Sequence, residues 1–375
     1  MAARFWVGGA GTWDALSTAN WSATSGGVAG SLAPTILDTA TFDANSGTGT
    51  VSVAATAVST STTVNNVNIN LSLTGSPTLC TAAGTLTLTT GTITLTTFTL
   101  TCGRFSSSNS NTRTIAFGTG KFNLTGNGAT VWATTTAASL TYSGTPVVDA
   151  SYSGATGTRT IGTSSASAIT LNITAGTDIV VTSGTSSFVN LDFSGFSGTL
   201  SNAARNIRGN FVVSSGMTVS AGTLGTTFNG TSGTQQITTN GKTLDFPLTF
   251  NGVGGTFAFQ DALTQGSTRA FTITNGTVQF KASVTSTVGS LGTSSTNQKF
   301  LQSTLAGTQA TLSQVTGTVS VGYLTIKDIN ATGGATFNAY TVNSNVNAGN
   351  NLGWDFFAQL GKTIFTRRKE KRVLI

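Results

Sequence analysis

The sequence predicts an all-β fold, a single-chain parallel β-helix (β-solenoid), expected to be right-handed and to carry aromatic-rich capping ends. Three observations predict it. Apolar residues alternate with Thr and Ser over long stretches, which is the period of a strand with one buried face. The strands are short and lack the two-residue Asn-Gly turns of an antiparallel meander. Charged residues make up only 8% of the chain, as expected where stacked coils would place like charges side by side.

Residues 1–45 form the first expected unit, an N-terminal cap. Trp6, Trp13 and Trp21 lie in this segment, and Trp354 lies near the other end of the chain. Large aromatic side chains suit the last coil of a solenoid, where the open core must be covered. An uncovered edge would also invite end-to-end pairing between molecules. These four tryptophans are therefore the candidate capping residues.

Residues 46–355 form the expected β-helix body. In residues 84–102, GTLTLTTGTITLTTFTLTC, apolar residues alternate with Thr, which favours extended backbone without adding an apolar outer face. The pattern predicts an apolar inner face and Thr outside. The residues predicted inside are Leu86, Leu88, Ile93, Leu95, Phe98, Leu100 and Cys102. Upstream, Val67, Ile69, Leu71 and Leu73 show the same alternation.

The two cysteines give a hint of the coil length. Cys80 and Cys102 are 22 residues apart, close to one three-strand coil, so stacking would bring them within one strand spacing of about 4.8 Å. A chance spacing of two small core residues explains the pair equally well. Two cysteines do not make a disulfide framework.

Residues 356–375 form a basic, partly apolar tail. Six basic residues against Glu370 give residues 362–375 a net charge of +5 out of the chain's +7. This pattern favours an attachment segment for an acidic surface of another protein, although a solvated, frayed terminus has the same composition. The candidate attachment residues are Phe356, Phe357, Leu360, Lys362, Phe365, Arg367, Arg368, Lys369, Lys371 and Arg372.

The composition argues against acid–base and metal chemistry. The chain has no His, so His triads and His metal sites are excluded. Asp14, Asp38 and Asp43 form the only loose acidic cluster, and turn capping explains them better than the six to eight oxygen ligands of Ca²⁺. We expect no enzyme activity, no cofactor and no metal.

The sequence shows neither a membrane span of about 20 apolar residues nor the apolar core of a signal peptide, so release by cell lysis is the expected route out of a cell.

Several segments resemble bacteriophage virion structural proteins and some large bacterial surface proteins. The resemblance rests on Trp-Val-Gly-Gly at Trp6–Gly9, Gly-Thr-Trp-Asp at Gly11–Asp14, Ala-Asn-Trp-Ser at Ala19–Ser22 and the Pro-Thr…Phe-Asp step at Pro34–Asp43. Residues 106–126, 232–257, 261–277 and 326–356 are similar to the same proteins, whereas the basic tail departs from the shared pattern. The resemblance implies a non-enzymatic tail fibre, spike or capsid-decoration protein located in the virion.

The implied partners are other virion proteins, bound through the tail. A host-surface glycan and further copies of the chain are additional candidates, whereas nucleic acid and membrane are not expected because basic residues outside the tail are sparse.

Three alternatives remain open at this point. The first is a bacterial surface adhesin. The second is an ice-binding protein, because Thr85-x-Thr87, Thr92-x-Thr94 and Thr97-x-Thr99 supply regularly spaced Thr pairs, which would have to align coil after coil. The third is a polysaccharide-degrading β-helix, which needs two positioned carboxylates. Asp192 with Asp245, or Asp261 with Asp328, are the pairs that stacking could bring together.

Overall fold

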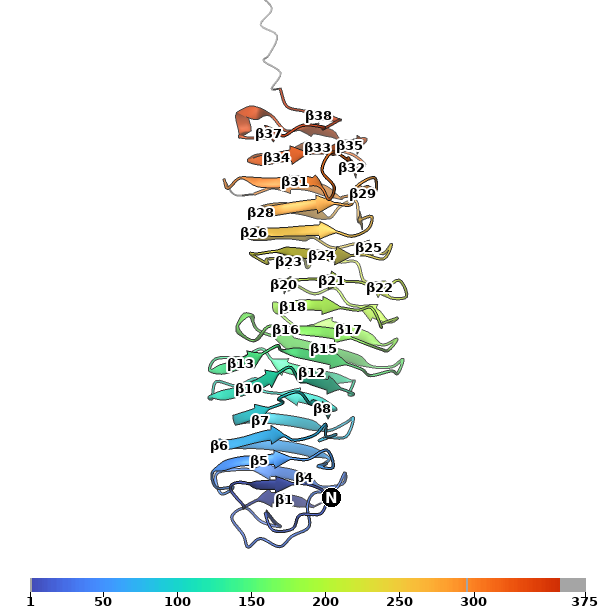
Figure 1. Cartoon of the computed structure of the whole chain (residues 1–375). Helices are drawn as coiled ribbons and strands as arrows, with labels where there is room; N and C mark the ends of the chain where they lie inside the picture. The colour runs from blue at the N-terminus through green and yellow to red at the C-terminus, as the bar shows by residue number, and fades with distance from the viewer. Residues whose placement is uncertain (1, 295, 358–375) are drawn as a thin grey trace, which may run out of the picture.

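The chain winds into a stack of about 14 parallel β coils, drawn in Figure 1 from the blue N-terminal end to the red C-terminal end. The computed structural model describes residues 2–294 and 296–357. Within this part, every strand pairing is parallel except that of β1 with β3. The only helices described are two single 3₁₀ turns, η1 (Ser165–Ser167) and η2 (Thr341–Asn343). The predicted parallel β-helix is confirmed.

Four sheets run along the rod. The first contains β1 (Ala3–Trp6), β2 (Gly11–Trp13), β3 (Trp21–Ser22), β4 (Thr39–Phe42), β5 (Gly49–Val53), β6 (Ser61–Leu73), β7 (Thr85–Thr94), β9 (Arg104–Ser106), β10 (Arg113–Gly118), β12 (Ala129–Thr134), β13 (Leu140–Gly144), β15 (Thr158–Thr163), β17 (Ile179–Thr182), β19 (Thr199–Leu200) and β22 (Thr218–Val219). The second contains β8 (Thr99–Cys102), β11 (Lys121–Leu124), β14 (Val147–Ala150), β16 (Ile169–Ile173), β18 (Ser186–Asp192), β20 (Arg205–Ile207), β21 (Phe211–Val212), β23 (Thr226–Phe228), β24 (Thr234–Thr238), β26 (Leu248–Phe259), β28 (Ala270–Phe280), β30 (Ser290–Thr293), β31 (Lys299–Ser303), β34 (Leu324–Lys327) and β37 (Val346–Asn347). The third contains β25 (Thr243–Leu244), β27 (Thr264–Gln265), β29 (Thr285–Thr287), β32 (Ala310–Gln314) and β35 (Ile329–Gly333), and the fourth contains β33 (Thr318–Ser320), β36 (Thr336–Asn338) and β38 (Trp354–Asp355).

One coil can be followed from β25 through β26 to β27, which pairs back onto β25 with Thr243 opposite Thr264. Strand β26 bends in its middle, where its register with β28 shifts between Asn251 and Thr256. The coil therefore has three straight segments and spans 21 residues from Thr243 to Thr264. Each coil rests on the one before, so successive side chains at one position lie about 4.8 Å apart.

The interior holds the apolar half of the alternating pattern. Leu86, Leu88, Ile93, Leu95, Leu100 and Cys102 are all buried, as predicted. Phe98 is half-buried and packs against the same core from the turn between β7 and β8. The Thr residues of β7 between the buried positions point outward and are half-buried. The period-two interpretation of this segment is therefore confirmed.

Val67 is a wrong prediction, because its side chain is 60% exposed. Strand β6 turns a corner here, and Asn66 takes the inward position instead. The Asn66 Nδ2 donates hydrogen bonds to the carbonyls of Asp43 and Gly47 at 2.8 and 3.0 Å. The corner interrupts the alternation, so Val67 lies outside while Ile69 and Leu71 lie inside.

The expected direct stacking of the two cysteines is off by one position. Cys80 and Cys102 are free thiols, both buried on adjacent coils. A parallel bridge pairs Thr78 with Thr101, and this register places Leu79 rather than Cys80 beside Cys102. Burial raises the pKa of the Cys80 thiol to about 11, and it also raises the pKa of Cys102.

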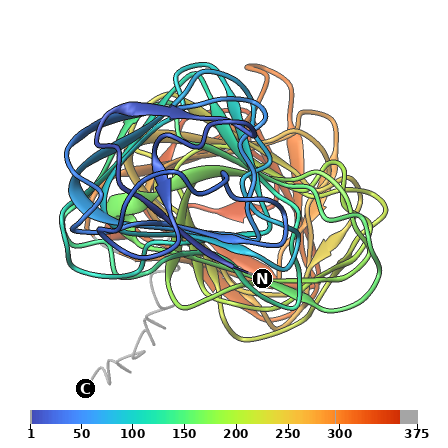
Figure 2. The ribbon, with the colours of Figure 1, turned by 90° about the horizontal axis from the view of Figure 1, so that it is seen from below.

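Phenylalanines form ladders in the second half of the rod. Phe228 and Phe250 stack with ring centroids 5.3 Å apart, and Phe250 continues to Phe271 at 4.9 Å. Phe259 and Phe280 form a second stack at 5.2 Å. Figure 2, seen from the N-terminal end, shows the coils superposed around one interior. Repetition of like residues coil after coil fills that interior.

Candidate functional site

The three tryptophans of the N-terminal unit gather in one buried cluster. Trp6 and Trp21 face each other across the β1–β3 pair, with ring centroids 5.2 Å apart. Trp13 lies 5.4 Å from Trp21, and all three rings pack around Phe42. All four side chains are completely buried, and the strands that carry them lie in the first coils, at the blue end of Figure 1. This is the position that a cap requires, and the capping role itself stays a prediction.

The same unit also exposes apolar side chains that the sequence interpretation missed. Its loops hold large aliphatic residues with exposures of 60% or more, on a rod whose outer surface is otherwise mainly hydroxyl-bearing. They are Leu16, Val28, Leu32, Ile36 and Leu37. They fall in irregular segments without a period, so no strand pattern distinguishes inward from outward positions there.

The C-terminal end of the described chain is packed onto the last coil. Trp354 on β38 is half-buried and meets Phe337 of β36 with ring centroids 5.1 Å apart. Phe356 is buried, and its carbonyl accepts a hydrogen bond from the Thr341 amide at 3.1 Å. Phe356 therefore belongs to the body and is not free to contact a partner, whereas Phe357 is 81% exposed. The other candidate attachment residues, Leu360, Lys362, Phe365, Arg367, Arg368, Lys369, Lys371 and Arg372, lie outside the described residues.

A buried ion pair crosses the middle of the rod. The guanidinium of Arg159, on β15, donates to both oxygens of Asp178 at 2.7 and 2.8 Å, and both side chains are completely buried. The same guanidinium also donates to the carbonyls of Ala150 and Ala175. The ring of Phe196 lies 5.4 Å from the guanidinium carbon. The Arg159 guanidinium thus has hydrogen-bond partners on all three nitrogens, and these bonds hold neighbouring coils together. We call this arrangement the clamp.

Two further buried arginines lack an acidic partner among their described contacts. Arg113 donates to Ser107 Oγ at 2.9 Å and to several carbonyls of neighbouring loops. Arg205 donates to the hydroxyls of Thr182 and Thr226 and to the Ser201 carbonyl, and burial lowers its pKa to about 10. These side chains tie loops to the coils from within.

The carboxylates suggested as catalytic pairs each accept hydrogen bonds from neighbouring groups. Asp245 forms an ion pair with Arg269 at 2.6 Å. Asp261 accepts hydrogen bonds from Thr239 and from the Asn240 amide. For the remaining two carboxylates, Asp192 caps a turn by accepting from the Ser194 amide, and Asp328 accepts from Gly307 and Asn350. Of these four carboxylates, only Asp192 makes the local contact of a turn-capping aspartate. The other three bond to residues 21 to 24 positions away in the sequence, on a neighbouring coil.

The Thr pairs suggested for ice binding do not continue along the rod. Thr87 of β7 stands between Thr63 of β6 and Ser106 of β9, but Thr85 pairs with Arg104. The row of Thr side chains that contains Thr85 therefore ends after β7, where the next coil carries Arg104 at this position. Thr97 lies in the turn between β7 and β8 rather than on a strand.

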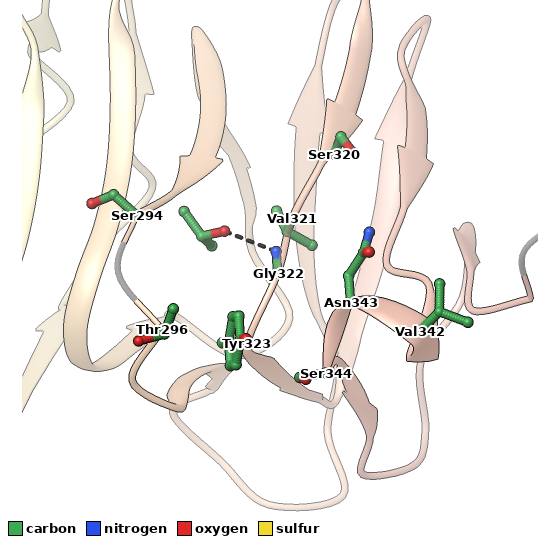
Figure 3. Close-up of a pocket in the computed structure, with 10 residues that line it drawn as sticks. Ser294, Thr296, Ser320, Val321, Gly322, Tyr323, Val342, Asn343 and Ser344 are labelled. Atoms are coloured by element: carbon green, nitrogen blue, oxygen red, sulfur yellow. Dashed lines mark hydrogen bonds between the residues drawn. The ribbon is translucent and has the colours of Figure 1, made fainter.

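An open groove of about 560 Å³ crosses three successive coils near the C-terminal end (Figure 3). Its walls carry hydroxyl groups, one carboxamide, two valines and one aromatic ring, and no acidic or basic side chain. The lining residues are Thr293, Ser294, Thr296, Ser320, Val321, Gly322, Tyr323, Val342, Asn343 and Ser344. A second groove of about 470 Å³, around Ser164, Ser183 and Asn206, is lined by similar polar residues without an aromatic ring.

Tyr323 occupies the turn in the middle of the first groove with a left-handed backbone, φ 55°. A bulky side chain in this region is unusual, since it costs about 1–2 kcal/mol relative to ordinary backbone. Three contacts hold the turn. The Gly322 amide donates to Thr293 Oγ1 at 2.9 Å, and Lys299 Nζ donates to the Gly322 carbonyl. Asn345, which is buried, donates to the Val321 carbonyl at 2.8 Å.

Within the described residues, no three Cys, Asp or Glu side chains gather as a group that could hold a metal ion. The same part of the chain contains no helix of the length and apolarity that crossing a membrane requires. Comparison with family models, curated proteins and solved structures finds no match to the chain.

Proposed function

We propose that the chain is a structural component of a bacteriophage virion, a tail fibre, spike or capsid-decoration protein without enzymatic activity. The observation that carries the proposal is the uninterrupted parallel stack from β1 to β38. Each coil shares its backbone hydrogen bonds with the next, so the described chain is a rod whose length is set by the number of coils. The resemblance of residues 1–45 and of the body to phage structural proteins supplies the setting.

The chemistry of the rod supports a mechanical role. The outer face carries mostly Thr, Ser and Asn, which solvate the surface without charge, and the interior is a continuous apolar core. Backbone amides paired coil to coil resist local opening, and this protects a rod from proteases outside a cell. The four carboxylates considered for glycoside hydrolysis are each held by hydrogen bonds or an ion pair in the described chain, which supports a structural rather than a catalytic role for them.

The two ends are proposed to act differently. The N-terminal unit covers the first coils with its tryptophan cluster, and the basic tail after Phe356 attaches the rod to another virion protein. The attraction combines charge pairing, screened over about 8 Å at physiological salt, with apolar contact that salt does not weaken. The attached rod then projects its remaining length toward the host surface.

Quantitative mass spectrometry of purified particles tests the proposal. Particles released by lysis of the source cells should contain the chain at a fixed copy number, and antibody labelling should find it on the tail, at the vertices or over the capsid surface. A handful of copies indicates a tail or vertex position, and hundreds indicate capsid decoration. A chain absent from particles and found on intact cell surfaces would overturn the virion assignment in favour of an adhesin.

A further inference from the structure

The groove at Tyr323 combines a concave shape with an aromatic ring, which the groove around Ser164, Ser183 and Asn206 lacks. Its three walls come from successive coils and carry Thr293, Ser294 and Thr296 on the first, Gly322 and Tyr323 on the second, and Asn343 and Ser344 on the third. Two strand spacings separate the first wall from the third, so the groove extends over about 10 Å along the rod axis. Its volume of about 560 Å³ is of the size that small ligands fill.

The composition of the walls restricts the ligand class. Six of the ten lining residues carry hydroxyl groups, Asn343 adds a carboxamide, and none carries a charge. A lining of this kind offers hydrogen bonds in both directions and no ion-pairing group, which suits a neutral, hydroxyl-rich molecule. The Tyr323 ring adds an apolar surface with a polar tip. A ligand with one apolar face and several hydroxyls matches both features.

The backbone of the groove is fixed before any ligand arrives. Tyr323 and Ser344 both adopt left-handed backbone, at φ 55° and φ 60°, and the Tyr323 amide donates to the Asn343 carbonyl at 2.9 Å. Lys299, buried below the turn, lies 5.7 Å from the centre of the Tyr323 ring. The ring is thus held by a positioned turn, and a fixed site loses little conformational freedom on binding. Strained backbone that its surroundings hold in place is a feature of ligand sites.

We infer that this groove binds a neutral oligosaccharide, with the Tyr323 ring packed against the apolar face of a sugar ring. Asn343 and the hydroxyls of the neighbouring coils bond to the sugar hydroxyls, directly or through water. The inference adds a ligand to the proposed function, and its biological role rests on that function. The binding itself is a property of the purified chain, so it fails or holds independently of where the chain resides.

The test is a binding measurement on the full chain with named probes. The probes are the neutral trisaccharides cellotriose, maltotriose, tri-N-acetylchitotriose and mannotriose, surveyed by saturation-transfer NMR and quantified by calorimetry. The decisive variant is Tyr323→Gly, which removes the ring and at the same time suits the left-handed backbone. We expect at least one trisaccharide to bind the unaltered chain, and Tyr323→Gly to weaken that binding at least tenfold, or about 1.4 kcal/mol, with no loss of thermal stability.

Matched controls separate the ring from its surroundings. Ser283→Gly relieves the same backbone conformation, φ 60°, on a different turn and should leave binding unchanged. Asn343→Ala in the groove should weaken binding, whereas Asn206→Ala in the groove without an aromatic ring should not.

Three results would overturn the inference. The first is no binding of any of the four trisaccharides at millimolar concentration. The second is Tyr323→Gly binding as tightly as the unaltered chain. The third is Tyr323→Gly binding weakly but melting at a clearly lower temperature, because the ring would then be a structural element rather than a ligand contact.

Discussion

Replacing Asp178 by alanine should open the middle of the rod locally while leaving both ends intact. The change removes two charge-assisted hydrogen bonds, at 2.7 and 2.8 Å, from a guanidinium that is completely buried. Arg159 keeps its two carbonyl partners but loses its counter-charge. Breaking a buried pair by removing one partner costs about 3–5 kcal/mol, because an uncompensated charge stays in the interior.

Hydrogen exchange measures this cost better than a global unfolding curve. Long repeat stacks do not unfold in one cooperative step, so a single free energy of unfolding is poorly defined for the whole chain. Exchange of the amides in β15 and β17 should accelerate by about two to four orders of magnitude, since each factor of ten corresponds to about 1.4 kcal/mol. Amides of β6 and β31, many coils away, should exchange as before.

A surface ion pair provides the matched comparison. Lys121 bonds to Asp149 at 2.6 Å, but the lysine side chain is 45% exposed, so Lys121→Ala should cost at most about 1 kcal/mol. The double variant Arg159→Met with Asp178→Ala should recover most of the lost protection from exchange, because it leaves no uncompensated buried charge at this site. If Asp178→Ala behaves like Lys121→Ala, or if the double variant is less protected than the single one, the clamp interpretation is wrong.

Four further predictions concern the two ends, the thiols and the carboxylates. Trp13→Ala should destabilise the N-terminal unit by about 3–5 kcal/mol, measured by thermal melting with light scattering; unchanged melting of monodisperse chains would refute the cap. Iodoacetamide at pH 8 should leave Cys80 and Cys102 of the folded chain unmodified by mass spectrometry, because the pKa of Cys80, about 11, leaves roughly one thiol in a thousand ionised; labelling as fast as in urea would contradict this. A chain ending at Phe356 should fold with an unchanged circular dichroism spectrum but be missing from particles, and normal incorporation would show that the tail is not the attachment segment. Prolonged incubation with host polysaccharide should release no sugar, and activity lost in Asp192→Asn or Asp261→Asn would establish an enzyme instead.

The sequence pattern predicts the straight segments of the coils and fails at their corners. The alternation of Leu86 and Leu88 with Thr is sufficient to place them inside, because a strand position has only two faces. The prediction for Val67 is wrong because the chain turns a corner there. Asn66 points inward in place of Val67 and bonds to two carbonyls of another loop. The conformation of a corner depends on contacts with the neighbouring coil. The residue period within one segment carries no information about these contacts.

The buried arginines could have been found from a signal that the alternation itself contains. Arg113, Arg159 and Arg205 each stand two residues before a buried isoleucine near a strand start, in TRTI, TRTI and RNI. Period two puts such an arginine on the inward face. The partner is the part that no pattern supplies, since Asp178 lies 19 residues after Arg159 and meets it only through the stacking of two coils.

The groove at Tyr323 is beyond the reach of pattern analysis for the same reason. Its lining residues come from three separate stretches between Thr293 and Ser344, and no stretch carries a recognisable motif alone. The left-handed conformation of Tyr323 depends on Lys299 and Asn345, which lie 24 residues before and 22 residues after it. Only the coil register brings these segments into one site.

The return of β27 onto β25 after 21 residues gives the gene a simple means of adjusting the length of the rod. An in-frame duplication or deletion of one such segment adds or removes a whole rung, and the flanking rungs meet a strand of the same direction and spacing. Each event changes the reach of the rod by about 4.8 Å. Length can therefore vary by recombination in small, equal steps, while the tryptophan cluster at one end and the basic segment at the other stay as they are.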